Sequence, residues 1–290
     1  MKKPKEPGSC IFCEGRPVTS EHMWPQWIGA LLPPLPGEPQ THTHVMTTTE
    51  AGPGFVTFRP KIHQARGPMQ SRKIRKVCGG KCNGGWMSQL EQAASRVMAP
   101  MIRGEEVSLG ASDLRGIANW AILTSIIGEY TDIPMQAISK EDRLQLMESW
   151  IARNETRSER IPDLPAGWRV CIASQNAASW RLGYSHTGLV SGRPGEPIPT
   201  TCNSQSTTFG MGCLLIHATS TYVAAVPSNQ FATTELVEIW PRVPDHLQWP
   251  RPYAQSEADV DWIARDLFRQ LANGLPATTE YLAQKARANR

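Results

Sequence analysis

Two closely spaced pairs of cysteines could together bind a metal ion. The pairs are Cys10 with Cys13 and Cys78 with Cys82, with two and three residues between their members. At such spacings one tight turn can present two thiolates to the same ion, and two pairs of thiolates are typical of tetrahedral structural zinc. The sequence therefore predicts a zinc site that joins two distant segments. The alternative is a set of unrelated buried thiols, because free cysteine is among the most often buried residue types.

Three polar residues near these cysteines have the chemistry needed for hydrolysis. Glu21 and His22 lie between the two pairs, and Asn83 directly follows the last cysteine. Carboxylate and amide oxygens are ligands for a hard cation, and a neutral imidazole can take a proton from water near pH 7. This combination suits metal-assisted hydrolysis of a phosphodiester. Taken singly, Glu21 and His22 could be a surface ion pair and Asn83 a helix N-cap.

Positive charge is concentrated in the same part of the chain. Residues 1–103 contain 14 Lys and Arg and 6 Asp and Glu, a net charge of +8, whereas the remaining 16 and 20 give −4. A basic module of this kind attracts a phosphate backbone. The densest basic run leads into the second cysteine pair and comprises Arg72, Lys73, Arg75 and Lys76. These residues are predicted to bind substrate, with an ordinary solvated charged strand as the alternative.

In order along the chain, these motifs resemble the zinc-bearing HNH endonucleases of the ββα-metal type, the endonuclease VII-like group. CIFC matches the first cysteine pair of that family, EHMWP its acidic residue, histidine and proline, and KCN its last cysteine with the following Asn. The resemblance implies a structural zinc on Cys10, Cys13, Cys78 and Cys82. It also implies His22 as general base, Glu21 and Asn83 as ligands of a catalytic Mg²⁺ or Mn²⁺, and double-stranded DNA as substrate. A role in phage, mobile elements or host defence is a further expectation from the resemblance.

Two features depart from the family pattern. The Asn that many HNH motifs carry shortly before the second cysteine pair is absent, because that region reads SRKIRK. The interval between the cysteine pairs is long, and residues 33–54 are rich in Pro, Gly and Thr, which predicts a loop or insertion. Residues 55–63 have strand character, with the basic run at 71–77 as a possible partner strand. From Asn83 onward, apolar residues at spacings of three and four predict an amphipathic helix.

The second half of the chain predicts helices around an antiparallel sheet. An apolar helix should begin at Ser112, a second should be capped by Ser139 and Asp142, and a last one by Ser256 and Asp259. Short strand-like runs lie between them: WRVCIA, SWRLGYS, TTFGMGCLLIHA, STYVAAVP and ELVEIWP. The predicted fold is α+β, with a zinc-containing ββα-metal HNH module at 1–103 and an α+β domain at 104–290.

Several classes of protein are disfavoured by the sequence. It contains no window of eighteen uncharged apolar residues and no signal peptide, so a cytoplasmic protein is expected. It contains no phosphate loop, dinucleotide-binding fingerprint or serine nucleophile elbow. The predicted function is that of an HNH-type deoxyribonuclease. The alternatives are a zinc-stabilised DNA-binding module without catalysis, and a nuclease effector gated by a ligand bound to the C-terminal half.

Overall fold

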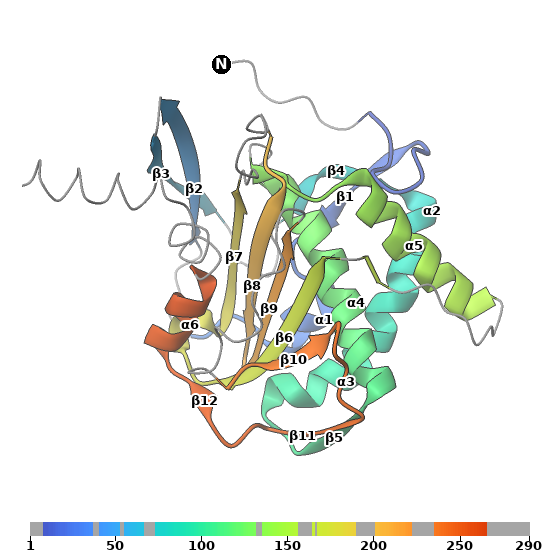
Figure 1. The fold of residues 1–290 in the computed structure, drawn as a ribbon, viewed down its shortest axis with the longest axis vertical. Coiled ribbons are helices and arrows are strands. Elements are labelled where there is room, and N and C mark those ends of the chain that lie inside the picture. The colour runs from blue at the N-terminus through green and yellow to red at the C-terminus, as the bar shows by residue number, and fades with distance from the viewer. Residues whose placement is uncertain are drawn as a thin grey trace, which may run out of the picture.

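The structure is a computed structural model. It describes residues 8–36, 41–52, 55–66, 73–131, 135–155, 164–165, 167–189, 201–221 and 235–265. Within these ranges only the backbone is described for residues 41–52, 55–66, 73, 75, 76, 153–155 and 189. The fold is mixed α and β, as the sequence predicts (Figure 1). Among the described residues, no helix combines the length and the apolar character needed to cross a lipid bilayer.

The N-terminal part consists of two antiparallel strands followed by a helix. Strand β1 (Val18–His22) pairs with β4 (Lys73–Gly79), and the short helix α1 (Gln26–Leu31) follows β1. Strand β4 leads directly into the helical segments α2 (Gly80–Cys82), η2 (Asn83–Met87) and α3 (Ser88–Arg103). The helical geometry is interrupted at Gly85, with φ −102° and ψ −115°. The helix expected from Asn83 onward therefore begins at Gly80 and is kinked.

The interval between β1 and β4 contains a long hairpin. Strand β2 (Thr41–Gly52) pairs with β3 (Phe55–Arg66) in antiparallel register along its whole length. Of the loop or insertion predicted over residues 33–54, the loop is wrong for 41–52, where the Thr-rich sequence favours extended backbone. The predicted pairing of 55–63 with the basic run is also wrong, because β3 pairs with β2 and β4 pairs with β1. Local sequence pattern does not reveal which strand a given strand will pair with.

The C-terminal part is built on a six-stranded sheet. Its strands are β6 (Trp168–Gln175), β7 (Leu182–Leu189), β8 (Ser204–Met211), β9 (Leu214–Thr221), β10 (Val237–Trp240) and β12 (Ala254–Gln255). Five are antiparallel in the order β10-β6-β9-β8-β7, and β12 pairs in parallel with β6. The run TTFGMGCLLIHA is not one strand, because it turns at Gly212, whose φ is +52°. A separate pair is formed by β5 (Val107–Gly110) and β11 (His246–Trp249).

Helices cover both faces of this sheet (Figure 1). Helix α4 (Ala111–Gly128) is buried on nearly all sides from Ile117 onward, as its apolar sequence predicts. A 3-10 turn (Glu129–Thr131) follows it, and α5 (Lys140–Glu155) begins after Ser139, whose Oγ accepts the Asp142 N–H at 3.0 Å. On the other face α6 (Glu257–Ala264) packs with a second 3-10 turn (Ala178–Trp180), and Ser256 and Asp259 form its predicted capping box.

One hydrophobic cluster joins the N-terminal part to the sheet. Trp24, from the segment after β1, lies edge-on to Phe209 of β8 with ring centroids 6.1 Å apart. Trp27 of α1 approaches Trp120 of α4 at 6.5 Å, and Trp120 in turn contacts Phe209 at 5.6 Å. The same cluster includes Cys10, Cys82 and Trp249. The predicted parts 1–103 and 104–290 thus share a core, while the boundary at residue 103 stays a prediction.

Candidate metal centre and active site

Three of the four paired cysteines lie together. The Sγ atoms of Cys10, Cys13 and Cys82 are all within 4.8 Å of one another, close enough to hold one metal ion. Cys10 and Cys82 are buried, whereas Cys13 is exposed. The donors are soft sulfur atoms, and such a set fits zinc rather than a hard cation. The structure therefore brings a candidate metal ligand set together from segments about seventy residues apart in sequence.

Hydrogen bonds in the backbone shape the loop that carries Cys10 and Cys13. The Cys10 N–H donates to Gly15 O and the Glu14 N–H to Cys10 O, both at 3.0 Å. Glu14 adopts a left-handed conformation with φ +59°, which lets the loop close tightly. The Ile11 N–H donates to Val77 O at 2.9 Å and so ties the loop to β4. The Cys10–Glu14 loop is thereby held against the strand that leads to Cys82.

The environment of Cys10 favours its thiolate form. Burial alone would raise the pKa of Cys10, but the backbone N–H groups of Cys13, Gly79 and Phe12 donate to its sulfur and lower the pKa below the usual value. Burial instead raises the pKa of Cys82 to about 12. A bound cation would offset the free-energy cost of ionising the buried Cys82 thiol, because metal ligation requires and stabilises thiolates.

Cys78, the predicted fourth zinc ligand, lies beside this group but is not one of the three. It is fully buried within β4, and its carbonyl accepts the Thr19 hydroxyl at 3.0 Å. Burial raises the pKa of its thiol, and the charges of Glu21 and of the other three cysteines add to that effect. The assignment of Cys78 as a ligand therefore stays a prediction.

Thr19 connects two of the three predicted catalytic residues. Its single O–H can donate to Glu21 Oε1 or to Cys78 O, each 3.0 Å away, and its oxygen accepts from Asn83 Nδ2 at 3.4 Å. Glu21 is 6% exposed and Asn83 is half-buried. The structure thus brings the carboxylate of β1 and the amide of the helix to the same threonine. Sequence reasoning missed Thr19, although its position two residues before Glu21 in a strand indicates a shared face.

Glu91 is a second carboxylate at this place. It lies in the first turn of α3 and is half-buried. Burial raises the pKa of Glu21 to about 7, and burial together with the charge of Glu21 raises the pKa of Glu91 to about 7. No described Lys or Arg forms an ion pair with either carboxylate. Two neighbouring carboxylates with a nearby amide are a donor set that fits a hard divalent cation.

The sequence assigned no role to Glu91. The signal that could have found it is an acidic side chain in the first turn of the helix that follows the last cysteine. Glu91 follows Asn83 by about two helical turns' worth of residues, although the helical geometry between them is interrupted at Gly85. Its closeness to Glu21 nevertheless depends on how β1 and the helix pack, which the spacing does not give.

The predicted basic run lies on the strand opposite His22. In the β1–β4 ladder His22 pairs with Lys73 and Ser20 with Lys76, with irregular register on both sides of Ser20. Irregularities of this kind bend a strand and redirect its side chains. His22 itself is half-buried in β1. Arg72 and the side chains of Lys73, Arg75 and Lys76 lie outside the described residues, so their predicted contact with substrate stays a prediction.

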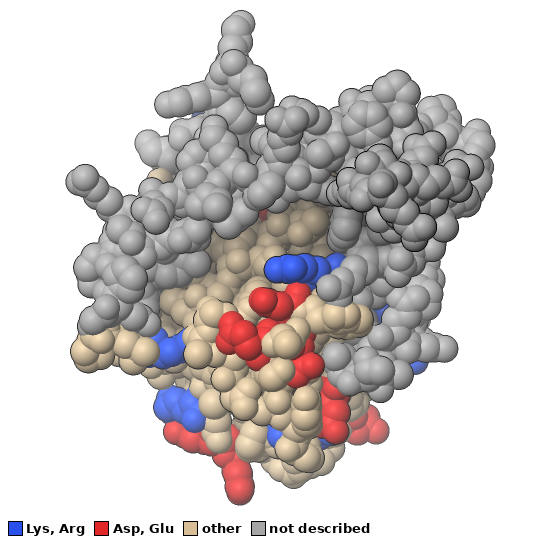
Figure 2. Space-filling view, turned by 90° about the vertical axis from the view of Figure 1, so that its left-hand side faces the viewer, with Lys and Arg blue, Asp and Glu red and all other residues tan. Residues whose placement is uncertain are grey.

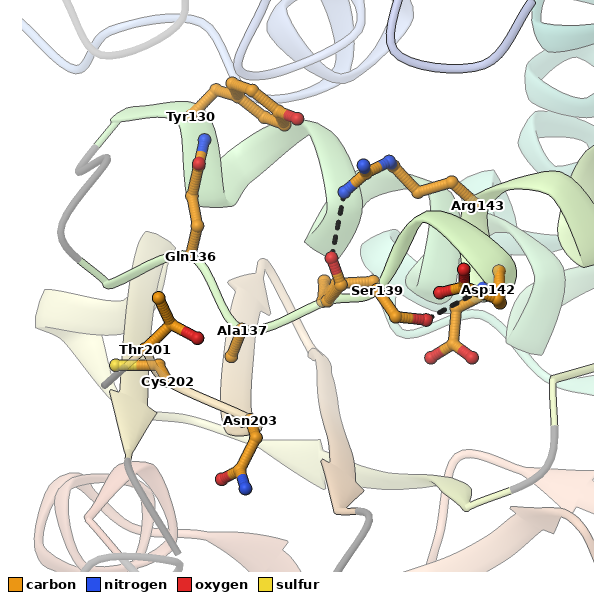
Figure 3. Close-up of a pocket in the computed structure, with 11 residues that line it drawn as sticks. Tyr130, Gln136, Ala137, Ser139, Asp142, Arg143, Thr201, Cys202 and Asn203 are labelled. Carbon is orange, nitrogen blue, oxygen red and sulfur yellow. Dashed lines mark hydrogen bonds between the residues drawn. The ribbon is translucent and has the colours of Figure 1, made fainter. Parts of the chain in front are cut away.

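A pocket of about 550 Å³ lies at the start of α5 (Figure 3). The 136–139 segment and Tyr130 form one side of it, and residues 201–203 form another. Arg143 extends along its upper edge in this view. Its lining mixes amide, hydroxyl and charged groups with apolar ones, as in many small-molecule sites. No role in the predicted catalysis follows from its position.

Acidic side chains gather on another part of the described surface. On the face shown in Figure 2, which is the side of Figure 1 where α6 lies, acidic side chains gather near the middle. Helix α6 alone carries Glu257, Asp259 and Asp261. Acidic side chains repel a phosphate backbone, so these residues of α6 are not expected to contact nucleic acid.

Comparisons with known proteins add no relative. No family model matches the sequence, no curated protein matches it, and no solved structure matches the fold.

Proposed function

We propose that this chain is a metal-dependent HNH-type endonuclease that hydrolyses phosphodiester bonds in double-stranded DNA. The observation that carries the proposal is the meeting of Glu21, Thr19 and Asn83 at the junction of a two-stranded antiparallel ladder and the helix that follows it. Three thiols that could hold zinc lie at the same junction. Two strands, a helix and a polar cluster between them are the arrangement that the sequence resemblance implies.

His22 is assigned the role of general base. It neighbours Glu21 in β1, and a half-buried imidazole retains access to water. A neutral imidazole can remove a proton from an attacking water. The phosphate that this water attacks would be drawn to the basic residues of β4, which pair with β1.

Two kinds of metal ion have a place in the proposal. Glu21 and Asn83, with Glu91 as a further carboxylate, would hold Mg²⁺ or Mn²⁺, which supplies Lewis-acid stabilisation of charge on the phosphate. Cys10, Cys13 and Cys82, with Cys78 as the predicted fourth ligand, would hold a structural zinc. Zinc at that place would fix the β1–β4 ladder relative to the helix without touching substrate.

Supercoiled plasmid incubated with the full-length protein and Mg²⁺ or Mn²⁺ tests the proposal. We expect nicking or linearisation by the wild type, and a rate lower by roughly two to four orders of magnitude for His22→Ala, the range usual for loss of a general base. His246→Ala is the matched control, because His246 is exposed on β11 and far in sequence from the site.

Each outcome has a distinct meaning. Equal cleavage by His22→Ala and wild type would remove His22 from the mechanism. Intact plasmid in every lane, with DNA retained in a gel-shift experiment, would favour a zinc-stabilised DNA-binding module without catalysis. The absence of both cleavage and DNA binding would contradict the proposal as a whole.

A ligand-gated nuclease is the second candidate function. The observation that favours it is the pocket at the start of α5, because Arg143 on its edge also contacts the loop that carries Cys10 and Cys13. A nuclease of this kind would be inactive on plasmid until a small molecule is added. Activity of the purified protein with metal alone would argue against it.

A further inference from the structure

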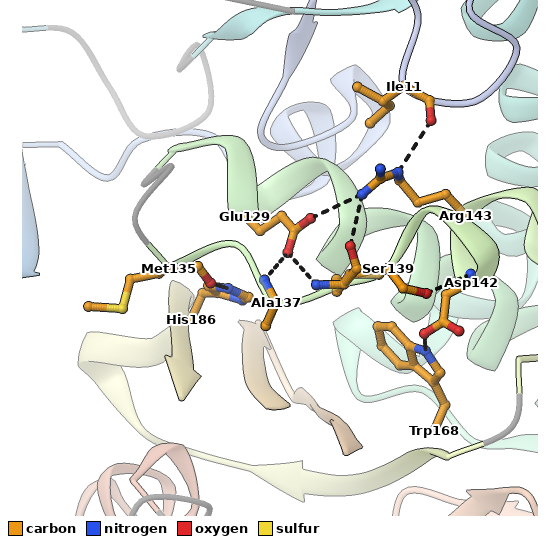
Figure 4. Close-up of polar contacts among 10 residues, drawn as sticks. Ile11, Glu129, Met135, Ala137, Ser139, Asp142, Arg143, Trp168 and His186 are labelled. Atoms are coloured by element: carbon orange, nitrogen blue, oxygen red, sulfur yellow. Dashed lines mark hydrogen bonds and ion pairs between the residues drawn. The ribbon is translucent and has the colours of Figure 1, made fainter. Parts of the chain in front are cut away.

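The loop that carries Cys10 and Cys13 is held from a second side by α5. Arg143 lies in the first turns of that helix, and its Nε donates to Ile11 O at 3.3 Å (Figure 4). Ile11 stands between the two cysteines, and its own N–H donates to Val77 O in β4. Both polar groups of Ile11 are therefore bound, one by β4 and the other by Arg143.

The same guanidinium is anchored within the C-terminal part of the chain. Its Nη1 donates to Ile138 O at 2.8 Å and lies 3.8 Å from Glu129 Oε1. Glu129 is fully buried, and its other oxygen accepts the N–H groups of Ala137 and Ile138 at 3.0 and 3.1 Å. Figure 4 shows this chain of contacts running from Ile11 through Arg143 to Glu129. One side chain, that of Arg143, thus joins three segments: the end of α4, residues 137–138 and the loop that carries Cys10 and Cys13.

Arginine is suited to this position because its guanidinium is planar and presents donors in several directions. Arg143 uses different nitrogens for Ile11 O and Ile138 O. A lysine ammonium is a single point donor and cannot reproduce that fork. Lys140 also pairs with Glu14 at the edge of the same loop, but both side chains are about half exposed or more, and exposed pairs contribute little.

We propose that Arg143 is a positioning residue for the metal-binding loop, so that the C-terminal part of the chain sets the geometry and affinity of the thiol site. The inference rests on the proposed zinc site. Partners that orient metal ligands through hydrogen bonds typically change metal affinity about 10- to 100-fold when they are removed. The site would then be completed by α5 as well as by the two cysteine segments.

Zinc affinity of the full-length protein tests the inference. We expect Arg143→Met to weaken zinc binding about 10-fold or more in a competition titration with a chromophoric chelator. The sulfur-to-cobalt charge-transfer and ligand-field bands of the Co²⁺-loaded protein should also change, because they report the geometry of the thiolates. Arg143→Lys keeps the charge beside Glu129 but loses the fork of donors. Compared with Arg143→Met, it should therefore have a higher Tm but an equally weakened affinity for zinc.

Arg169→Met is the matched control. The Arg169 and Arg143 side chains are 16% and 17% exposed, and each lies near a glutamate. Arg169 pairs with Glu238 at 3.0 Å, but it lies on a strand of the sheet and not beside the loop that carries Cys10 and Cys13. We expect it to lower stability while leaving zinc affinity and the Co²⁺ spectrum unchanged.

Unchanged zinc affinity and Co²⁺ bands in Arg143→Lys would overturn the inference, whether or not Arg143→Met folds. A wild-type chain that binds no zinc would overturn it as well. A chain that binds zinc but leaves plasmid intact would contradict only the nuclease proposal, because the titration does not depend on cleavage.

Discussion

Both carboxylates of the candidate active site have pKa values raised by their surroundings. Burial raises the pKa of Glu21 to about 7, and the neighbouring Glu21 charge helps to raise that of Glu91 to about 7. Neither has a described cationic partner that would offset the cost of its charge. At neutral pH, two buried carboxylates of this kind destabilise the folded protein unless a cation binds them.

A dependence of stability on pH follows for metal-free protein. Below about pH 4.5 both carboxyls are protonated in the folded and the unfolded chain, so they cost nothing. As the pH rises toward 7 the unfolded chain releases these protons first, and the folded chain loses stability. We expect Glu21→Gln to remove much of this slope, with a gain at pH 7 of up to about 3 kcal/mol, from about 1.4 kcal/mol per pH unit between the two pKa values.

Urea denaturation of wild type and Glu21→Gln, in chelator and across pH 4.5 to 8, measures this effect. The difference between the two proteins isolates Glu21, because Glu129, whose pKa burial also raises to about 7, is common to both. Glu141→Gln on exposed α5 surface is the control. Parallel pH profiles for wild type and Glu21→Gln would show that the Glu21 carboxyl titrates normally. Added Mg²⁺ should flatten the wild-type profile.

At the scale of elements, the junction of β4 with α2 brings Cys82 close to the loop that carries Cys10 and Cys13. Strand β4 carries Cys78 and ends at Gly79, and Cys82 follows in α2. A Cβ at Gly79 would lie 3.3 Å from Cys10 Cβ, so the absence of a side chain lets the strand end approach the first cysteine loop. The three thiols that could hold a metal ion therefore lie where a strand, a helix and a loop meet.

Replacement of one thiol should release the metal and destabilise this junction. We expect Cys82→Ser to lose stoichiometric zinc, measured by atomic emission on the purified protein. Zinc at a thousandfold excess over its Kd adds about 4 kcal/mol to folding, so a chelator should lower the Tm of wild type but not that of Cys82→Ser. Cys171→Ser is the control, because Cys171 is equally buried but lies in β6. Full zinc content in Cys82→Ser would exclude Cys82 as a ligand.

At the scale of the whole molecule, one core spans the N-terminal segments, α4 and the sheet. Trp27 and Trp24 reach from the N-terminal part to Trp120 and Phe209. Helix α3 also packs against α4. The described N-terminal segments therefore pack apolar side chains against the remainder, and this packing stabilises the elements of the candidate active site.

Such a shared core predicts unfolding in one cooperative step. We expect the loss of the Co²⁺ charge-transfer bands, of far-UV circular dichroism and of tryptophan fluorescence to coincide along one urea titration. Trp120→Ala, which removes a ring between Trp27 and Phe209, should shift all three transitions together by about 3–5 kcal/mol. Separate transitions, with the Co²⁺ bands lost first, would instead support an independent N-terminal module.

Signals of short range in sequence determined a good part of this structure. Neighbours along the chain set the caps at Ser139 and Ser256 and the all-round burial of α4. A cap involves residues three apart, and a buried helix needs only a continuous apolar sequence. The mixed α and β fold and a cysteine cluster near the N-terminus followed from such patterns.

Tertiary structure alone decided which distant segments meet. The sequence allowed β4 to pair with β3, yet it pairs with β1, and residues 41–52 form a strand where a loop was expected. Glu91 beside Glu21, Thr19 between Glu21 and Asn83, and Arg143 on Ile11 have no local signature. The physical reason is that strand pairing and side-chain contacts across the core depend on the packing of the whole chain, and a local pattern fixes a face of an element but not the partner of that face.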